Sequence, residues 1–252
     1  MLAILPHPAI FAHRGSSVHA PENTLAAFDL ALQQGADAIE LDAKLTRDEQ
    51  VIVFHDQNVD RTTNGTGPVN SFSLVELKAL DAGSHFSQTY QGEKIPTLEE
   101  VFQKFSNSTF INIELTNYAT PSDRLPEKVV ELVSRYQLEG KVLFSSFNPR
   151  TLSRAHKLLP QVPIGLLALP GWKGAWARSW LSRLIPHQAL HPEFHDVTAS
   201  LVNKIHRDHK RLFVYTVNAP EDIQWTADMN VDGIFTDDPL LAREIFTEKR
   251  RG

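Results

Sequence analysis

The sequence predicts an α/β protein folded as a (β/α)8 barrel. Short apolar, β-branched runs alternate with longer helical patterns from one end of the chain to the other. Strictly alternating strand–helix units imply parallel strands that are joined by right-handed crossovers. Eight such units in 252 residues fit one barrel domain over residues 1–252, with a doubly wound open sheet as the alternative architecture.

The first half of the chain supplies the first strands of this barrel. A strand over 8–13 is followed by a helix over 22–35, which a glycine ends. Two further apolar runs, at 37–43 and 50–56, are predicted to be neighbouring strands. The segment 58–96 is too long for a plain strand–helix loop, so we expect a small insertion over the barrel mouth.

The second half repeats the strand–helix unit after a helix over 97–105. The expected strands cover residues 109–115, 142–146, 163–168, 187–191, 212–217 and 233–236. The expected helices cover residues 123–137, 149–158, about 172–184, 198–208 and 219–228, and a last one starts at about 238. The carboxyl ends of parallel strands collect at one end of a barrel, which is where barrels carry their chemistry.

Composition and charge restrict the class of protein. Hydrophobic residues make up 42% of the chain, and the absence of cysteine excludes disulfides and thiol nucleophiles. A net charge of −5 argues against nucleic acid as a partner. Between Glu139 and Glu193, however, there are seven basic residues and no acidic one, which suits an anionic substrate or surface. The N-terminus does not resemble a signal peptide, so we expect a cytoplasmic protein.

Three carboxylates are predicted to point into the barrel. Glu40 and Asp42 share one face of the run 37–43, and Glu114 lies near the end of the strand 109–115. Buried charge that is not compensated costs several kcal/mol per ion. All-oxygen ligands suit a hard divalent cation, so this cluster predicts a Mg²⁺ or Ca²⁺ site. The alternative is that these acids pair with Arg14, Lys44 or Arg61.

Two histidines end strands beside this cluster. His13 closes the first strand and His55 closes the run 50–56. Imidazole titrates near neutral pH, so the pair could act as base and acid. Alternatively, each is a satisfied histidine of the core or rim. His191, at the end of another strand, is a further candidate for lining the site, whereas His19 is expected in a loop.

With these residues located, the chain resembles the glycerophosphodiester phosphodiesterase family. The similarity is dense over residues 10–67, where the chain reads AHRG, APENTLAAF, GADAIELDAKLTRD, VIVFHD and DRTTNGTG. It returns at INIEL, SSFNP, LHP, VYTVN and VDGIFTDDP, so it spans the whole chain. A lone HRG is unspecific, but HRG, PENT, E-x-D and HD at these spacings are highly specific.

The resemblance implies metal-dependent hydrolysis of glycerophosphodiesters to an alcohol and sn-glycerol 3-phosphate. It implies that Glu40, Asp42 and Glu114 bind the cation, with His13 as general base and His55 as general acid, two roles that could be exchanged. The residues that it implies for contact with the substrate or its phosphate are Arg14, Glu40, His55 and Tyr215. Two alternatives are phospholipase D-type hydrolysis of lysophospholipids at the same metal site and a non-catalytic binding barrel. The sequence predicts no oligomeric state.

Two positions depart from the family pattern. Family members commonly have a lysine two residues after the third carboxylate, where this chain has Thr116. Lys44 or the basic sector could supply a positive charge near the phosphate instead. The aromatic residue before TVN is often tryptophan and is Tyr215 here, on the pocket wall. Both changes bear on the preferred substrate more than on the reaction.

Tryptophans recur at every fourth position within residues 170–186, at Trp172, Trp176 and Trp180. The favoured interpretation is a barrel helix that packs this aromatic stripe on the strands. The alternative is a helix at the mouth that grips an alcohol or acyl tail, or touches an anionic membrane.

Overall fold

Eight parallel strands close into a barrel in the computed structural model, which describes residues 2–249. The strands are β1 (Ala9–His13), β2 (Ala38–Leu45), β4 (Phe110–Leu115), β5 (Val142–Ser146), β6 (Ile164–Ala168), β7 (Ala189–Pro192), β8 (Arg211–Val214) and β9 (Gly233–Thr236). They follow one another as β1-β9-β8-β7-β6-β5-β4-β2, and a parallel β1–β2 pairing closes the ring. The predicted (β/α)8 barrel is therefore confirmed, and the open sheet is excluded.

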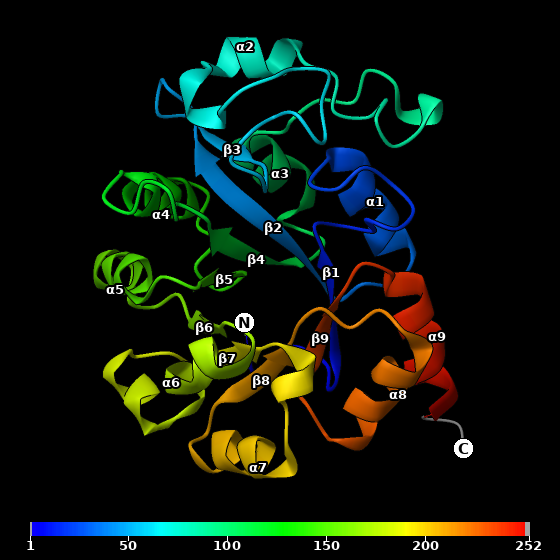
Figure 1. Ribbon diagram of the computed structural model, residues 1–252, viewed down its shortest axis with the longest axis vertical. Coiled ribbons are helices and arrows are strands. Elements are labelled where there is room, and N and C mark those ends of the chain that lie inside the picture. The colour runs from blue at the N-terminus through cyan, green and yellow to red at the C-terminus, as the bar shows by residue number, and fades with distance from the viewer. Residues whose placement is uncertain (1, 250–252) are drawn as a thin grey trace.

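Helices follow the strands and surround the barrel (Figure 1). They are α1 (Leu25–Gln33), α2 (Leu74–Ala79), α3 (Leu98–Phe105), α4 (Leu125–Arg135), α5 (Pro149–Leu158), α6 (Ala175–Arg178), α7 (Ala199–Arg207), α8 (Pro220–Asp228) and α9 (Pro239–Lys249). Short 3-10 turns are η1 (Val69–Ser71), η2 (Gln88–Tyr90), η3 (Gly171–Gly174), η4 (Trp180–Leu184) and η5 (Phe194–Asp196). Local caps explain several helix starts, because a hydroxyl there accepts a backbone N–H that has no partner within the helix. Thr24 caps α1 in this way, and Thr97 and Glu100 form a capping box at α3.

The run predicted at 50–56 is shorter and differently placed than expected. Only β3 (Val51–Val53) is a strand, and it pairs antiparallel with the outer end of β2. It is therefore one arm of a hairpin and not part of the closed barrel. The hairpin reverses the chain, and the Phe54 N–H donates to the Asp42 carbonyl. As a result, His55 follows the strand as coil and returns to the level of Asp42.

Apolar side chains form separate layers inside and outside the barrel wall. Inside, the ring of Phe11 lies 4.8 Å from the rings of both Phe213 and Phe235, and all three are buried. Outside, Ile39 and Leu41 belong to the cluster that packs the strands against the helices. Because side chains alternate along β2, the residues between and after these two face the barrel interior.

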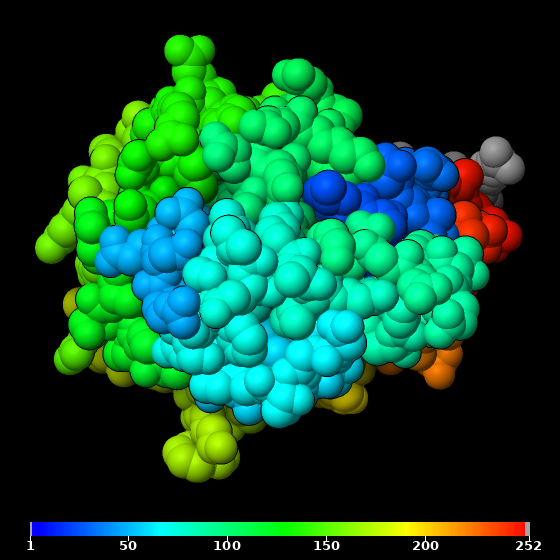
Figure 2. All heavy atoms as spheres, turned by 90° about the horizontal axis from the view of Figure 1, so that it is seen from above, coloured from blue at the N-terminus to red at the C-terminus, as the bar shows by residue number. Residues whose placement is uncertain are grey.

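The segment between β3 and α3 forms a small unit at one end of the molecule, which Figure 1 shows in cyan and green at the top. It contains η1, α2 and η2. Its own apolar cluster includes Phe54, Val59, Val69, Leu77 and Ile95. Figure 2, seen from this end, shows the segment in cyan and blue-green across the centre of this face. This segment adds walls next to the mouth of the barrel.

The predicted continuous helix over 172–184 is wrong. This part of the chain is divided into η3, α6 and η4, with extended backbone at Ser179. Trp176 packs against the barrel core, but Trp172 and Trp180 are 84% and 69% exposed. The break rotates these side chains out of one stripe, so the aromatic row does not pack on the strands as expected.

Candidate active site

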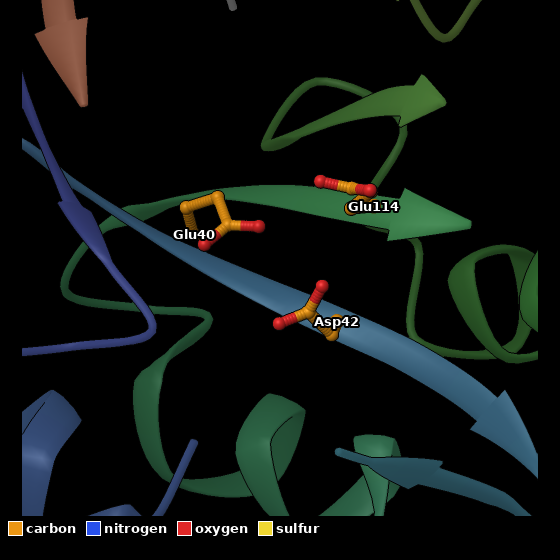
Figure 3. Close-up of side chains that lie close together, drawn as sticks. All are labelled: Glu40, Asp42 and Glu114. Atoms are coloured by element: carbon orange, nitrogen blue, oxygen red, sulfur yellow. The ribbon is translucent and has the colours of Figure 1, made fainter. Parts of the chain in front are cut away.

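Three carboxyl groups meet on two neighbouring strands at the barrel mouth. Strand register places Asp42 of β2 opposite Glu114 of β4. Glu40 precedes Asp42 by two residues and therefore shares its face. One oxygen of each group lies within 4.8 Å of the others, and Figure 3 shows the three side chains together over β2 and β4.

The electrostatics of this cluster fit a bound cation. Burial, and then the charges of Asp42 and Glu114, raise the pKa of Glu40 well above its ordinary value. Burial and the charge of Asp42 raise the pKa of Glu114 to about 8. The Oε1 atom of Glu40 is buried and has no hydrogen-bond partner among the described residues. A hard divalent cation would supply the missing charge and accept these oxygen ligands.

Arg14 contributes one positive charge beside the carboxylates. Its Nε lies 3.3 Å from Asp42 Oδ2, and its backbone N–H donates to Glu40 Oε2 over 3.0 Å. Burial raises the pKa of Asp42, but the charges of Arg14 and of His55 outweigh that effect and lower it overall. One arginine does not balance three carboxylates, so ion pairing alone leaves the cluster undercompensated.

The other two cations that were considered as partners are bound elsewhere. Arg61 is held by Asp56, with Nε 2.7 Å from Oδ2, and by Glu22. The Lys44 ammonium donates to the carbonyl and the hydroxyl of Thr116, both over 3.1 Å. Among the described residues, neither side chain therefore forms an ion pair with the cluster, although the nearby charge of Lys44 opposes the rise in the pKa of Glu114.

The turn after β1 places Arg14 and needs a glycine. Arg14 has φ 56° and Gly15 has φ 87°, both in the left-handed region. A Cβ atom on Gly15 would lie 2.7 Å from the Ala27 side chain of α1. Glycine therefore allows the turn to approach α1 closely.

His13 is held by a carboxylate from the opposite end of the sequence. Its Nδ1 lies 2.6 Å from Oδ1 of Asp237, which follows β9. This carboxylate also accepts from Ser17 and from the Asn218 amide. A carboxylate at Nδ1 assigns the proton to that nitrogen, which leaves Nε2 free to accept a proton.

His55 forms a second pair of the same kind. Its Nδ1 lies 2.7 Å from Oδ1 of Asp56. The hydrogen bond from Arg61 is the main cause that lowers the pKa of Asp56 to about 2, with smaller contributions from His55. Asp56 is therefore ionised near neutral pH and orients the imidazole.

These groups surround a cavity of about 180 Å³. His13, Arg14, Glu40, His55 and Glu114 all contribute to its wall. Tyr215 lies there too, as expected for a pocket wall, and its hydroxyl donates to the Ala168 carbonyl over 2.6 Å.

The floor of the cavity carries polar groups without protein partners. His191 is fully buried at this floor, and neither ring nitrogen has a hydrogen-bond partner within residues 2–249. Burial lowers the pKa of His191 to about 3, so its imidazole is neutral. The Oδ1 atom of Asn112 is also buried and unpartnered among the described residues. Such groups in a cavity indicate a polar ligand that supplies their hydrogen bonds.

Several site residues were missed in the sequence. Asp237 lies in the VDGIFTDDP motif and Asp56 in the HD pair. Their positions near the ends of predicted strands could have marked them as site residues. Tyr118 had no such signal. Its hydroxyl donates to Glu114 Oε1 over 2.7 Å and accepts the Phe147 N–H. Only the path of the loop after β4 brings this phenol to the carboxylate.

Comparisons with known proteins agree with this architecture. A sequence model of the glycerophosphoryl diester phosphodiesterase family matches residues 13–241. A glycerophosphodiester phosphodiesterase of Caldanaerobacter subterraneus subsp. tengcongensis is 41% identical over 231 residues, covering 91% of this chain and 94% of the relative. A glycerophosphodiester phosphodiesterase of Bacillus altitudinis is 38% identical over 245 residues, covering 96% of this chain and 99% of the relative.

A solved structure shows the same fold with a product bound. It is a phosphodiesterase of Oleispira antarctica in complex with sn-glycerol-3-phosphate. It aligns with a TM-score of 0.85 at 33% identity, covering 96% of this chain and 97% of that chain. The barrel and these matches define the protein as a phosphoric diester hydrolase. The chain belongs to the glycerophosphoryl diester phosphodiesterase family, which confirms the resemblance found in the sequence and removes the non-catalytic alternative.

Proposed function

We propose that this protein hydrolyses glycerophosphodiesters to an alcohol and sn-glycerol 3-phosphate, with a divalent cation and a pair of histidines. The observation that carries the proposal is the common cavity. Two imidazoles, each oriented by an aspartate at Nδ1, line the same cavity as the carboxylates of Glu40 and Glu114. An acid, a base and a charge-stabilising site are what phosphodiester hydrolysis requires.

The residues that would hold the cation are Glu40, Asp42 and Glu114. When bound, Mg²⁺ or Ca²⁺ would stabilise the charge that develops on the phosphoryl oxygens. The Arg14 guanidinium adds a fixed positive charge beside this position and lines the cavity. A guanidinium in the cavity wall can donate to a phosphate oxygen of the substrate.

Proton transfers are assigned to the two histidines. His13 Nε2 takes a proton from the nucleophile, which is either water or the neighbouring glycerol hydroxyl. The nucleophile attacks phosphorus, and the bond from phosphorus to the alcohol oxygen breaks. His55 gives a proton to that oxygen as the alcohol leaves. When the nucleophile is the glycerol hydroxyl, this step forms a cyclic phosphate. Water, which gives a proton to His55, then attacks phosphorus, and the glycerol oxygen leaves with the proton held by His13 to form sn-glycerol 3-phosphate. Asp237 and Asp56 hold the two rings and stabilise their charged forms.

The test is hydrolysis of a panel of glycerophosphodiesters before and after chelation with EDTA. We expect turnover in the untreated protein, its loss on chelation, and its recovery when Mg²⁺ or Ca²⁺ is added back. Full activity after complete chelation would contradict the role of the cation. Full activity of His13→Ala would contradict the assignment of that histidine.

A second candidate substrate is a lysophospholipid, cleaved at the same site. It is favoured by exposed apolar side chains after β6, since Trp172, Trp180 and Leu184 are 84%, 69% and 77% exposed. None of the described helices combines the length and the apolar character that a bilayer crossing needs. The residues that would contact a membrane are these exposed side chains within 170–186.

Co-sedimentation with anionic liposomes tests this second candidate. Trp172→Ser and Trp180→Ser should reduce binding, whereas Trp225→Ser, a half-exposed tryptophan on α8, is the matched control. Equal liposome binding by all four proteins, the wild type included, would remove the membrane contact.

A further inference from the structure

Two motifs of the sequence contain residues with no role in the chemistry assigned above. They are the APENT run, which contains Glu22, and the DRTTNGTG run, which contains Arg61. The structure joins them, because the Arg61 guanidinium binds two carboxylates at once. Its Nε and Nη2 donate to Asp56 over 2.7 and 3.1 Å, and its Nη1 and Nη2 donate to Glu22 over 2.7 and 2.8 Å. Arg61 therefore connects the chain after β3 with the loop between β1 and α1.

The network extends from Arg61 to two groups of the catalytic cavity. In one direction, Asp56 is the carboxylate that holds His55, with Nδ1 2.7 Å away. In the other direction, Glu22 Oε1 accepts a hydrogen bond from Arg14 Nη1 over 3.1 Å. His55 and Arg14 both line the cavity, whereas Arg61 is not among the described residues that do. Contact with a substrate is therefore made by these two residues and not by Arg61.

Negative and positive charges alternate along this network. Burial raises the pKa of Glu22, but the hydrogen bond from Arg61 and the charge of Arg14 outweigh it and lower that pKa overall. Glu22 and Asp56 are therefore both ionised near neutral pH, with Arg61 between them. Without this guanidinium the two carboxylates would repel each other, and each would attract the cavity group that it contacts more strongly. Arg61 thus controls how far Glu22 draws Arg14 toward itself.

The turn that carries Arg61 is fixed by its own contacts. The Thr63 hydroxyl donates to the Val59 carbonyl over 2.7 Å and accepts the Gly65 N–H over 3.0 Å. Val59 is buried in the apolar cluster of this segment, and a Cβ atom on Gly65 would lie 2.9 Å from the Leu80 side chain. The turn therefore presents the guanidinium from a fixed position, and the planar fork of an arginine can bind two carboxylates in pairs of hydrogen bonds.

Stability alone does not account for this arrangement. The Arg61 side chain is 50% exposed, and ion pairs at exposed sites contribute little to the free energy of unfolding. Paired hydrogen bonds do, however, fix the direction of the groups that they join. What distinguishes this network is its position. Its two ends are the imidazole assigned to protonate the alcohol and the arginine beside the acidic cluster.

We propose that Arg61 is a positioning residue for the reaction, which holds His55 through Asp56 and Arg14 through Glu22 so that both can act on the same phosphate. This inference rests on the proposed function, because it takes His55 as the acid and Arg14 as a contact of the phosphate. Arg61 itself forms no bond to the substrate and transfers no proton.

The effect through Asp56 is tested with two leaving groups. Arg61→Gln should lower kcat/KM roughly 100-fold for the ethyl diester of sn-glycerol 3-phosphate but only roughly 10-fold for the p-nitrophenyl diester, since p-nitrophenol leaves without a proton. Asp56→Asn should also slow the ethyl diester more, and adding Arg61→Gln to it should not increase this difference. Equal losses for the two diesters in Arg61→Gln, or a larger difference in the double variant, would overturn the inference.

The effect through Glu22 is tested by calorimetry with sn-glycerol 3-phosphate, which has no leaving alcohol. Arg61→Gln should weaken its binding roughly 10-fold, because Glu22 then draws Arg14 away from the phosphate. This loss should not grow when Glu22→Gln is added, since the second substitution removes the charge that draws Arg14. An unchanged affinity in Arg61→Gln, or a further loss in the double variant, would also overturn the inference.

Arg135→Gln is the matched control for both measurements. Arg135 lies on α4, is 53% exposed and also contacts two carboxylates, with its Nη atoms 3.4 Å from Glu99 and 2.9 Å from Glu131. This variant should change neither the ratio of the two diesters nor the affinity for sn-glycerol 3-phosphate. If Arg61→Gln does not fold, Arg61→Lys replaces it. Lysine keeps the charge but cannot form both pairs of hydrogen bonds, so it should show the same two losses.

Failure of the proposed function has a different signature. If the wild-type protein hydrolyses neither diester in the presence of Mg²⁺ or Ca²⁺, the reaction is misassigned, and the affinity for sn-glycerol 3-phosphate still tests the link from Arg61 to Arg14. If the wild type hydrolyses both diesters and Arg61→Gln slows them equally, only the positioning role is wrong.

Discussion

The Nδ1 atom of His13 lies 2.6 Å from Oδ1 of Asp237, although 224 positions separate the two residues in sequence. The contact exists because β1 and β9 are neighbours where the barrel closes. Burial would raise the pKa of Asp237, but the hydrogen bond and the charge of His13 outweigh it and lower that pKa. Asp237 is therefore a charged partner that positions the imidazole.

Asp237→Asn should reduce kcat/KM for a glycerophosphodiester roughly 100-fold. The amide can donate to Nδ1, which would place the proton on Nε2 and remove the base. Steady-state kinetics check this, with the affinity for sn-glycerol 3-phosphate as a readout that should not move. Asp29→Asn, an exposed aspartate on α1, is the control. Wild-type kcat/KM in Asp237→Asn would show that the pair has no catalytic role.

The acid and base roles can be separated by changing the leaving group. His55→Ala should slow release of an alkyl alcohol by roughly 10²–10⁴-fold, but should slow release of p-nitrophenol far less, since that group leaves without a proton. His13→Ala should slow both. His19→Ala, in the loop after β1, should slow neither. If His13→Ala instead showed the dependence on the leaving group, the two roles would have to be exchanged.

Removal of one cluster carboxylate should abolish stabilisation by metal. A cation at 100 times its Kd adds about 2.7 kcal/mol to the free energy of unfolding of a protein that binds it only when folded. Thermal melts of the wild type should therefore shift upward with Mg²⁺ or Ca²⁺, and melts of Asp42→Asn should not. An equal shift in Asp42→Asn would place the cation elsewhere.

Tyr118→Phe should weaken cation binding roughly 10-fold while leaving the fold intact. The Tyr118 hydroxyl donates to Glu114 Oε1 over 2.7 Å, and loss of a group that orients a ligand typically costs 10–100-fold in affinity. Titration calorimetry with Mg²⁺ measures the change. Tyr90→Phe removes a hydroxyl that donates to the His19 carbonyl and serves as the control. Unchanged affinity in Tyr118→Phe would mean that this hydrogen bond does not act on the cation.

His187 should make the protein less stable in acid. It is buried, with Nδ1 2.8 Å from the Ile185 carbonyl and Nε2 3.0 Å from the Lys210 ammonium, so a second ring proton would face a cation. Burial is the main cause that lowers its pKa to about 4. The unfolded chain takes up this proton first, so the stabilisation is complete above pH 6.5 and is lost as pH falls toward 4.

The size of this effect can be measured by urea unfolding. Between pH 7 and pH 5 this histidine should account for about 2 kcal/mol of lost stability. His187→Gln should lose less stability over the same range. His209→Gln, at an exposed position after α7, should behave as the wild type. An identical pH dependence in His187→Gln and the wild type would contradict the assignment.

Much of the candidate site follows from local sequence patterns. The alternation of side chains in AIELDA placed Glu40 and Asp42 on one face, and parallel strands implied that Glu114 would join them. Periodicity depends on neighbouring residues alone, so it can be recognised in the sequence without knowledge of the tertiary structure. Prediction from periodicity was wrong where the backbone interrupts a regular element. The break at Ser179 divides the expected helix and exposes Trp172 and Trp180.

What the sequence by itself determined is the alternating order of strands and helices, the acidic cluster and the two histidines that lie beside it. The tertiary structure alone decided which aspartate holds His13, that Tyr118 reaches Glu114, and that Arg61 links Asp56 to Glu22. The physical reason is distance along the chain. These contacts form only when the barrel closes and its loops are packed. Local sequence patterns do not predict the path of a loop.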